Sequence, residues 1–241
     1  MIVQARMAST RLPGKVLKPV LGKPLLTYQV ERLQRVKQAD AIVLATTTND
    51  ADQVLVDFAQ AHELACYRGS EEDVLSRYHG AAEEAGADVV TRITSDCPLI
   101  DPAVIDKVIA TFTQSQPNCD YASNTLRRTY PRGMDCEVFS RKALGIAHAD
   151  AVESVDREHV TPFIYRHPDR FALRHVEYAS DCGDHRWTVD TIEDFALVSR
   201  MLEQLYPGHP NFTLEDCLDL LAEHPDWAQI NAGVRQKVLG Q

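Results

Sequence analysis

Basic and small polar side chains are concentrated in one short stretch near the start of the chain, Gln4–Lys15 (QARMASTRLPGK). Arg6, Arg11 and Lys15 offer planar and point-like donors suited to phosphate oxygens, and small residues such as Ser9 let backbone NH groups approach an anion. The stretch contains neither GxxxxGK[ST] nor GxGxxG, which disfavours a P-loop NTPase and a dinucleotide-binding loop. We therefore predict a phosphate-binding loop of another kind.

The distribution of charge supports a local anion site. The first thirty residues contain five basic residues and no acid, so they carry +5, whereas the whole chain of 241 residues carries −10 and the remainder therefore −15. An acidic chain argues against a general nucleic-acid surface. A basic segment within it favours a small anionic ligand instead.

Two aspartates could hold a cation that accompanies phosphate. Asp96 follows a strand-like run (DVVTRIT), and Asp190 lies in WTVDTIEDF, which we interpret as another strand-to-helix junction. Carboxylates that converge from separate junctions can share one Mg²⁺ with phosphate oxygens and water. Each also has a structural interpretation, because Asp96 could form a turn and Asp190 could cap a helix. We predict a magnesium site for this pair, and a helix cap for Asp101 ahead of Pro102.

A second cluster of arginines lies in the segment Arg127–Glu137 (RRTYPRGMDCE). Arg132, together with Arg127 or Arg128, could bind a carboxylate or phosphate on an acceptor molecule. Asp135 and Glu137 are two positions apart, which places them on one face of a strand, where they could receive sugar hydroxyls. The alternative is a surface turn whose arginines pair with neighbouring acids.

Glu158 and His159 belong to a predicted helix (DREHVTPFIY) and could contact the same acceptor. His159 has no second histidine or cysteine at ligand spacing, so zinc is not expected there. Six scattered cysteines without a CxxC pair fit reduced thiols. An apolar run approaching ~20 residues and a signal-peptide start are both missing from the sequence, so we expect a cytoplasmic protein without a membrane partner. Whether it forms a homodimer stays open.

The elements that must position these residues alternate in the first half of the chain. Apolar runs rich in β-branched residues alternate with amphipathic patterns, which predicts an α/β fold with a mostly parallel sheet flanked by helices. Four strands are expected in chain order, at 1–5, at 40–46, ending near 67, and at 88–94. Helices are expected at 24–36, 50–61, 70–86 and after 102. The carboxyl ends of such strands carry the ligand.

From about residue 118 the regular alternation of strands and helices ends, and the pattern predicts an α+β cap that binds the acceptor. Strands are expected within CDYAS, DCEVF and RFALRHVEY, and helices at 141–149, 155–167, 191–205 and 213–223. We predict one domain over 1–241, with a nucleotide-binding half at 1–117 and an acceptor and metal half at 118–241.

Five motifs in order carry a resemblance to a known family: QARMASTRLPGKVL, SDCPLID, YPRGMDCEVF, DREHVTPFIY and WTVDTIEDF. They resemble the cytidylyltransferases that activate acylneuraminate and 3-deoxy-octulosonate sugars, most of all the spore-coat polysaccharide biosynthesis protein F branch. The resemblance implies a Rossmann-like fold, CTP as the nucleotide donor and Mg²⁺ as the metal. By similarity, Asp96 and Asp190 are metal ligands, and the phosphates are contacted by Arg6, Ser9, Arg11 and Lys15.

The resemblance also concerns the base of the nucleotide. It implies that backbone groups near the first and third strands read the base, here Ala5 and the region Gly69–Arg77. Gln4 in the first predicted strand and Ser95 directly after the fourth complete the predicted nucleotide contacts. One departure is that the octulosonate enzymes carry DEPL where this chain has DCPL from Asp96.

Together these features predict transfer of CMP from CTP to a small anionic sugar-like acceptor, with release of pyrophosphate and with Arg11 and Lys15 neutralising the developing charge. A glycosyltransferase that uses a nucleotide-sugar is one alternative, but it has less use for so cationic a loop. A non-catalytic nucleotide-binding protein is another. Loss of a metal carboxylate would favour it, and both carboxylates are present.

Overall fold

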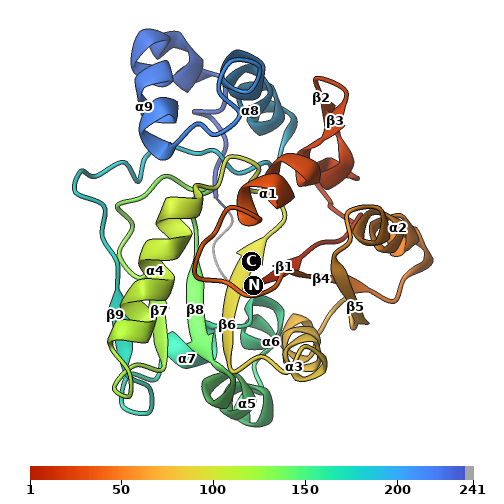
Figure 1. Cartoon of the computed structure of the whole chain (residues 1–241), viewed down its shortest axis with the longest axis vertical. Coiled ribbons are helices and arrows are strands. Elements are labelled where there is room, and N and C mark those ends of the chain that lie inside the picture. Colours follow the sequence, from red (N-terminus) through yellow and green to blue (C-terminus); the bar gives the residue numbers. More distant parts are fainter. Residues whose placement is uncertain (237–241) are drawn as a thin grey trace.

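One mixed sheet of seven strands runs through the computed structural model, which describes residues 1–236 (Figure 1). The strand order is β5-β4-β1-β6-β8-β7-β9. The strands are β1 (Ile2–Gln4), β4 (Val43–Thr47), β5 (Ala65–Gly69), β6 (Val89–Thr94), β7 (Tyr121–Ser123), β8 (Glu137–Ser140) and β9 (Leu173–His175), and β2 (Pro19–Val20) pairs with β3 (Lys23–Pro24) in a separate hairpin. The predicted Rossmann-like α/β fold is confirmed.

Helices cover both faces of this sheet. They are α1 (Leu25–Leu33), α2 (Gln53–Ala61), α3 (Val74–Glu84), α4 (Pro102–Gln114), α5 (Arg141–Asp150), α6 (Ser154–His159), α7 (Pro162–Tyr165), α8 (Ile192–Leu205) and α9 (Leu214–Glu223). Short 3₁₀ turns lie at η1 (Lys15–Leu17), η2 (Asp50–Asp52) and η3 (Pro225–Gln229). Over the described part of the chain, every helix is too short or too polar to cross a membrane.

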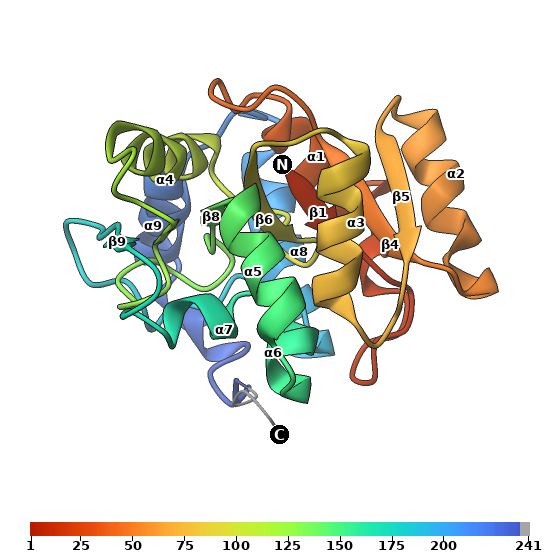
Figure 2. The same ribbon diagram turned by 90° about the horizontal axis from the view of Figure 1, so that it is seen from below.

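Side-chain alternation along the strands produces two hydrophobic cores. Val3 and Leu44 pack on one face with α1, α2, α4, α8 and α9, whereas their neighbours Ile2 and Val43 pack on the other face with α3, α5 and α7. Successive strand residues point to opposite faces, so a strand such as β1 or β4 supplies both cores. Figure 2 shows α3 and α5 side by side on the second face.

The direction of the strands decides where the loops meet. β1, β4 and β6 are parallel, so the segments after β1 and β6 leave the sheet at one edge. β8 runs antiparallel to β6 with Glu137 opposite Arg92, so β8 begins at that same edge. The loop between β7 and β8 therefore joins the loops that follow β1 and β6. The strands of the predicted cap extend the main sheet.

Two local predictions about helices are corrected. The helix predicted over 155–167 is two short helices, because Val160 has a φ of 74° and Pro162 has no NH to donate. The helix predicted to open at Ser70 begins after Asp73, whose side chain accepts from Ser76 N. The predicted cap at Asp101 is confirmed, since its side chain accepts from the second residue of α4.

Candidate active site

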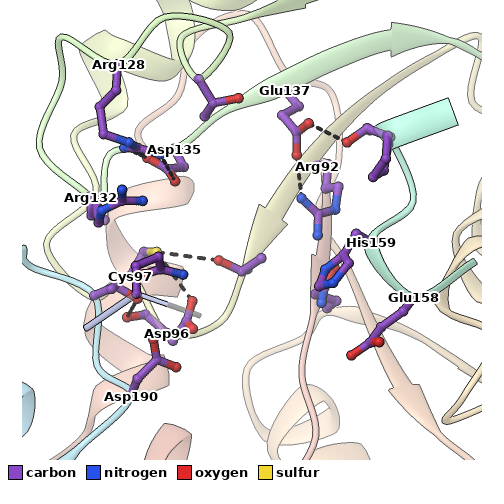
Figure 3. A pocket seen from close by; sticks show the side chains of 18 of the residues that line it. Arg92, Asp96, Cys97, Arg128, Arg132, Asp135, Glu137, Glu158, His159 and Asp190 are labelled. Carbon is purple, nitrogen blue, oxygen red and sulfur yellow. Dashed lines mark hydrogen bonds and ion pairs between the residues drawn. The ribbon is translucent and has the colours of Figure 1, made fainter. Parts of the chain in front are cut away.

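A cavity of about 610 Å³ opens at the edge where these loops meet (Figure 3). It is lined by residues predicted to bind nucleotide, metal and acceptor: Gln4, Arg11, Asp96, Arg128, Arg132, Asp135, Glu137, Glu158, His159 and Asp190. Residues from both halves of the chain thus share one site. The lining also includes residues that the sequence did not single out, namely Arg92, Thr94, Cys97, Thr125, Tyr165, Thr188 and Gln236.

The ammonium group of Lys15 lies between the two predicted metal carboxylates. Its Nζ donates to Asp96 Oδ2 at 2.9 Å and to Asp190 Oδ1 at 2.8 Å. Burial alone would lower the pKa of Lys15, but the two carboxylates raise it, so this amine stays charged. Burial would likewise raise the pKa of Asp96, yet Lys15 and hydrogen bonds from Thr94 and Cys97 lower it to about 2.

Backbone contacts explain why these groups converge. Asp96 follows β6, and its carbonyl accepts from Val189 N at 2.8 Å, which ties the two aspartate segments together. Gly14, with a φ of 67°, turns the loop after β1 into η1, where Lys15 is the first residue. A left-handed turn of this kind suits glycine, because a Cβ would strain it. The predicted convergence of Asp96 and Asp190 is confirmed.

Asp190 does not follow a strand, contrary to our prediction. Its segment makes only an isolated bridge, between Arg132 and Arg186, before Thr191 caps α8 with a capping box. The carboxylate of Asp190 is fixed instead by side chains, since Oδ2 lies 2.6 Å from Arg186 Nη2 and 3.1 Å from Arg11 Nη2.

Positive and negative charges balance at this end of the cavity. Three carboxylates face three cations in one connected cluster of Asp96, Asp190, Asp194, Lys15, Arg11 and Arg186. The buried Asp194 accepts from Arg186 Nε at 2.9 Å. An incoming polyphosphate therefore meets cations that already have partners, and it must exchange places with a carboxylate to reach them.

One wall of the cavity carries the arginines predicted to bind the acceptor. Arg128 makes a bidentate pair with Asp135, at 2.7 and 2.9 Å, whereas Arg132 makes no ion pair with any residue in the described range 1–236. Burial and the neighbouring Arg128 lower the pKa of Arg132, which means that its charge lacks compensation. Arg127 lies outside the cavity, 76% exposed, and pairs with Glu177.

The opposite wall is built around a buried ion pair between Arg92 and Glu137 (Figure 3). The other oxygen of Glu137 accepts from Tyr121 Oη at 2.6 Å and from Thr161 Oγ1 at 2.5 Å. These three partners give Glu137 a structural role that a sugar hydroxyl would have to compete with. Beside this pair, burial and nearby arginines lower the pKa of His159, which favours its neutral imidazole.

Several predicted nucleotide contacts do not line the cavity. Ala5 and Ser95 are buried at the strand ends, and Arg6 is 45% exposed and pairs with Glu71. Arg77 is buried in α3, where its Nη1 donates to the carbonyl of residue 70. Of the other predicted phosphate contacts, Ser9 lies on the loop after β1 and Lys15 begins η1, and neither lines the cavity. The roles of these residues toward a nucleotide stay predictions.

Arg92 is the lining residue that the sequence could have revealed. It is the only charged residue within β6, and its neighbours Thr91 and Ile93 are both buried. A charge inside a strand buried on both faces needs a partner or a ligand, and that requirement is a signal. Cys97 gave no such signal. Burial raises the pKa of its thiol, which therefore stays protonated beside Asp96.

A basic loop follows β1, Asp96 follows β6, and Asp190 faces Asp96 at the carboxyl ends of these parallel strands, which is where open α/β sheets bind their ligands. The sequence model described as "Cytidylyltransferase" matches residues 1–206, and the chain belongs to the cytidylyltransferase family. It is therefore a nucleotidyltransferase.

Known proteins resemble the chain over almost its whole length. The spore coat polysaccharide biosynthesis protein SpsF of Bacillus subtilis is 32% identical over 234 residues, which are 94% of this chain and 95% of that protein. The structure of a cytidylyltransferase from Leptospira borgpetersenii has a TM-score of 0.90 and 30% identity, and the match covers 98% of this chain and 97% of that one. A CMP:2-keto-3-deoxy-manno-octonic acid synthetase complexed with CTP shares the fold, with a TM-score of 0.65, 18% identity and coverage of 84% and 97%.

The arginine wall depends on Gly133, which yields a stability prediction. Gly133 has a φ of 105°, and a Cβ there would lie 2.8 Å from the backbone carbon of Trp187. The loop cannot move away easily, since Arg132 N donates to His185 O and Arg132 O accepts from Trp187 N. We expect Gly133→Ala to lower the free energy of unfolding by about 2–4 kcal/mol in denaturant titrations. Gly208→Ala, where a Cβ meets nothing within 4 Å, is the control, and equal losses in both variants would contradict the prediction.

Proposed function

We propose that this protein is a Mg²⁺-dependent cytidylyltransferase that transfers CMP from CTP to a hydroxyl of a small anionic sugar acid and releases pyrophosphate. The observation that carries the proposal is that Asp96 and Asp190 both face the ammonium group of Lys15, at the end of the basic loop. The chain also belongs to the cytidylyltransferase family. The structural relative complexed with CTP supports the choice of nucleotide, and its sugar-acid substrate supports the class of acceptor.

The chemistry of the two carboxylates fits a magnesium ion. Asp96 and Asp190 already contact one cationic group together, so a single ion in that position would reach both. Within residues 1–236, no three or more histidine, cysteine or acidic side chains are grouped to hold a metal. Mg²⁺ suits such a site, because it commonly takes one or two carboxylates and completes its shell with phosphates and water. When bound, it would neutralise phosphate charge and lower the pKa of the attacking hydroxyl.

Lys15 and Arg11 would act by exchanging partners. Both now contact Asp190, and both would turn to phosphate oxygens of CTP as the nucleotide enters. The acceptor hydroxyl oxygen attacks the α-phosphorus in line, the bond to the β-phosphate oxygen breaks, and the hydroxyl proton leaves to solvent. Positive groups fixed beside the transferred phosphoryl group stabilise the charge that develops there.

Arg132 would receive the anionic group of the acceptor. It is the cavity arginine whose charge is least compensated, while Arg128 is neutralised by Asp135. On the opposite wall a neutral His159 and the carboxylate of Glu158 can accept hydrogen bonds from sugar hydroxyls. The walls would thus hold the two ends of the acceptor across the cavity.

The proposal is tested by mixing the protein with each of four nucleoside triphosphates, Mg²⁺ and a panel of sugar acids, and by measuring pyrophosphate. We expect release with CTP and an acidic sugar, and a loss of about 10²-fold or more in Asp96→Asn and Asp190→Asn. Asp219→Asn, which changes an exposed carboxylate on α9, is the matched control. Normal turnover in either active-site variant, with its fold confirmed by circular dichroism, would refute the metal pair.

A second prediction concerns the cation that Lys15 provides. A metal ion must displace its ammonium group, so we expect Mn²⁺ to bind weakly until CTP offers Lys15 a new partner. In Lys15→Met the affinity for Mn²⁺ without CTP should rise about tenfold, because Asp96 then loses its cationic partner and Asp190 Oδ1 is freed, while Arg11 and Arg186 still hold Oδ2. Electron paramagnetic resonance of free Mn²⁺ measures this, with Lys18→Met as the control. An unchanged or lower affinity in Lys15→Met would contradict the arrangement.

The third prediction concerns the acceptor. A contact of Arg132 with a carboxylate, partly shielded from water, should contribute about 1.5–3 kcal/mol, or roughly a ten- to hundredfold preference in kcat/KM over the neutral amide analogue. Arg132→Lys should lose much of that preference, because lysine lacks the planar fork. The exposed Arg127→Lys should keep it. A wild-type enzyme that treats both acceptors alike would show that Arg132 has another role.

A further inference from the structure

The last described segment of the chain returns to the active site from outside the matched family region. The cytidylyltransferase match ends at residue 206, and α9 and η3 follow beyond it. After η3, Asn231 is buried, and Gln236 lines the cavity that holds Asp96 and Asp190. The site is thus completed by residues far from the motifs that define the family.

Asn231 anchors this segment. Its Nδ2 donates to the carbonyl of Arg186 and to Asp194 Oδ1, both at 2.9 Å. Asp194 is fully buried and also accepts from Asp190 N at 3.0 Å. The anchor therefore contacts the same short stretch that carries the catalytic carboxylate.

Gln236 contacts the guanidinium group of Arg186 directly. Its Oε1 accepts from Nη1, while Nε donates to Asp194 and Nη2 donates to Asp190 Oδ2 at 2.6 Å. A guanidinium group is planar with its donors in a fixed fork, so holding Nε and Nη1 sets the direction of Nη2. With its Oδ2 held by Nη2, Asp190 directs Oδ1 to the cation position that Lys15 now fills.

We propose that Gln236 is a positioning residue for nucleotidyl transfer, acting through Arg186 to orient Asp190 toward the metal. The inference rests on the proposed function, because it assigns Asp190 to a metal ion. Gln236 itself touches neither the nucleotide nor the reacting atoms in this scheme. Gln236 instead affects the orientation of the Asp190 carboxylate when the metal ion binds.

The test compares Gln236→Ala with Arg235→Ala, which removes an exposed side chain at the preceding position. Binding of Mn²⁺ in the presence of CTP is followed by electron paramagnetic resonance, and the melting temperature is measured in parallel. Loss of a direct partner of a metal ligand weakens metal binding about 10- to 100-fold. Because Gln236 acts one contact further away, through Arg186, we expect Gln236→Ala to weaken Mn²⁺ binding about five- to tenfold, with an unchanged melting temperature. Arg235→Ala should match the wild type.

A double-mutant cycle tests whether the effect passes through Arg186. In an Arg186→Lys background the fork is gone, so adding Gln236→Ala should weaken Mn²⁺ binding by less than about twofold. Equal losses in both backgrounds, or Mn²⁺ binding in Gln236→Ala equal to that of the wild type, would overturn the inference and leave the proposed function intact. A wild-type protein that fails to bind Mn²⁺ with CTP would overturn both.

Discussion

Asp96 and Asp190 stand on either side of a single ammonium group, and the rest of the site depends on keeping them there. Two carboxylates this close repel each other by a few kcal/mol in protein surroundings, so cations must compensate them. Lys15 does so from the loop after β1, and Arg186 does so from the segment before α8. The parallel pairing of β1 with β6 brings the loop of Lys15 beside Asp96. The sheet thus assembles a cluster that no single segment could form.

Most charged side chains in the cavity walls are also paired with an opposite charge. Arg128 pairs with Asp135 on one wall, and Arg92 pairs with Glu137 on the other, so these charges are compensated within the protein itself. Partly buried ion pairs contribute little net stability, because desolvation offsets their attraction. Exchanging one anionic partner for another therefore costs little, provided that the cation stays paired throughout. Arg132 is the exception, and its uncompensated charge gives the cavity a preferred place for an anion.

Some contacts of the site could be predicted from the sequence, and others could not. The meeting of Asp96 with Lys15 follows from general rules, since loops after parallel strands share an edge. The break in the helix after His159 was also accessible, because Pro162 cannot continue a helix. The pairing of Arg92 with Glu137 was not, because it needs the antiparallel register of β6 and β8, and strand register between distant segments leaves no local pattern.

Because β8 is antiparallel to β6, the loop before β8 can change in evolution independently of the pairing between β1 and β6. The segments that carry Lys15 and Asp96 leave the parallel strands β1 and β6, whereas the arginine loop hangs between β7 and β8. Insertions or substitutions in that loop alter the shape of one cavity wall and leave the parallel strand pairs in register. A family built on this sheet can therefore vary the loop between β7 and β8 while the parallel strands that position Lys15 and Asp96 are inherited unchanged.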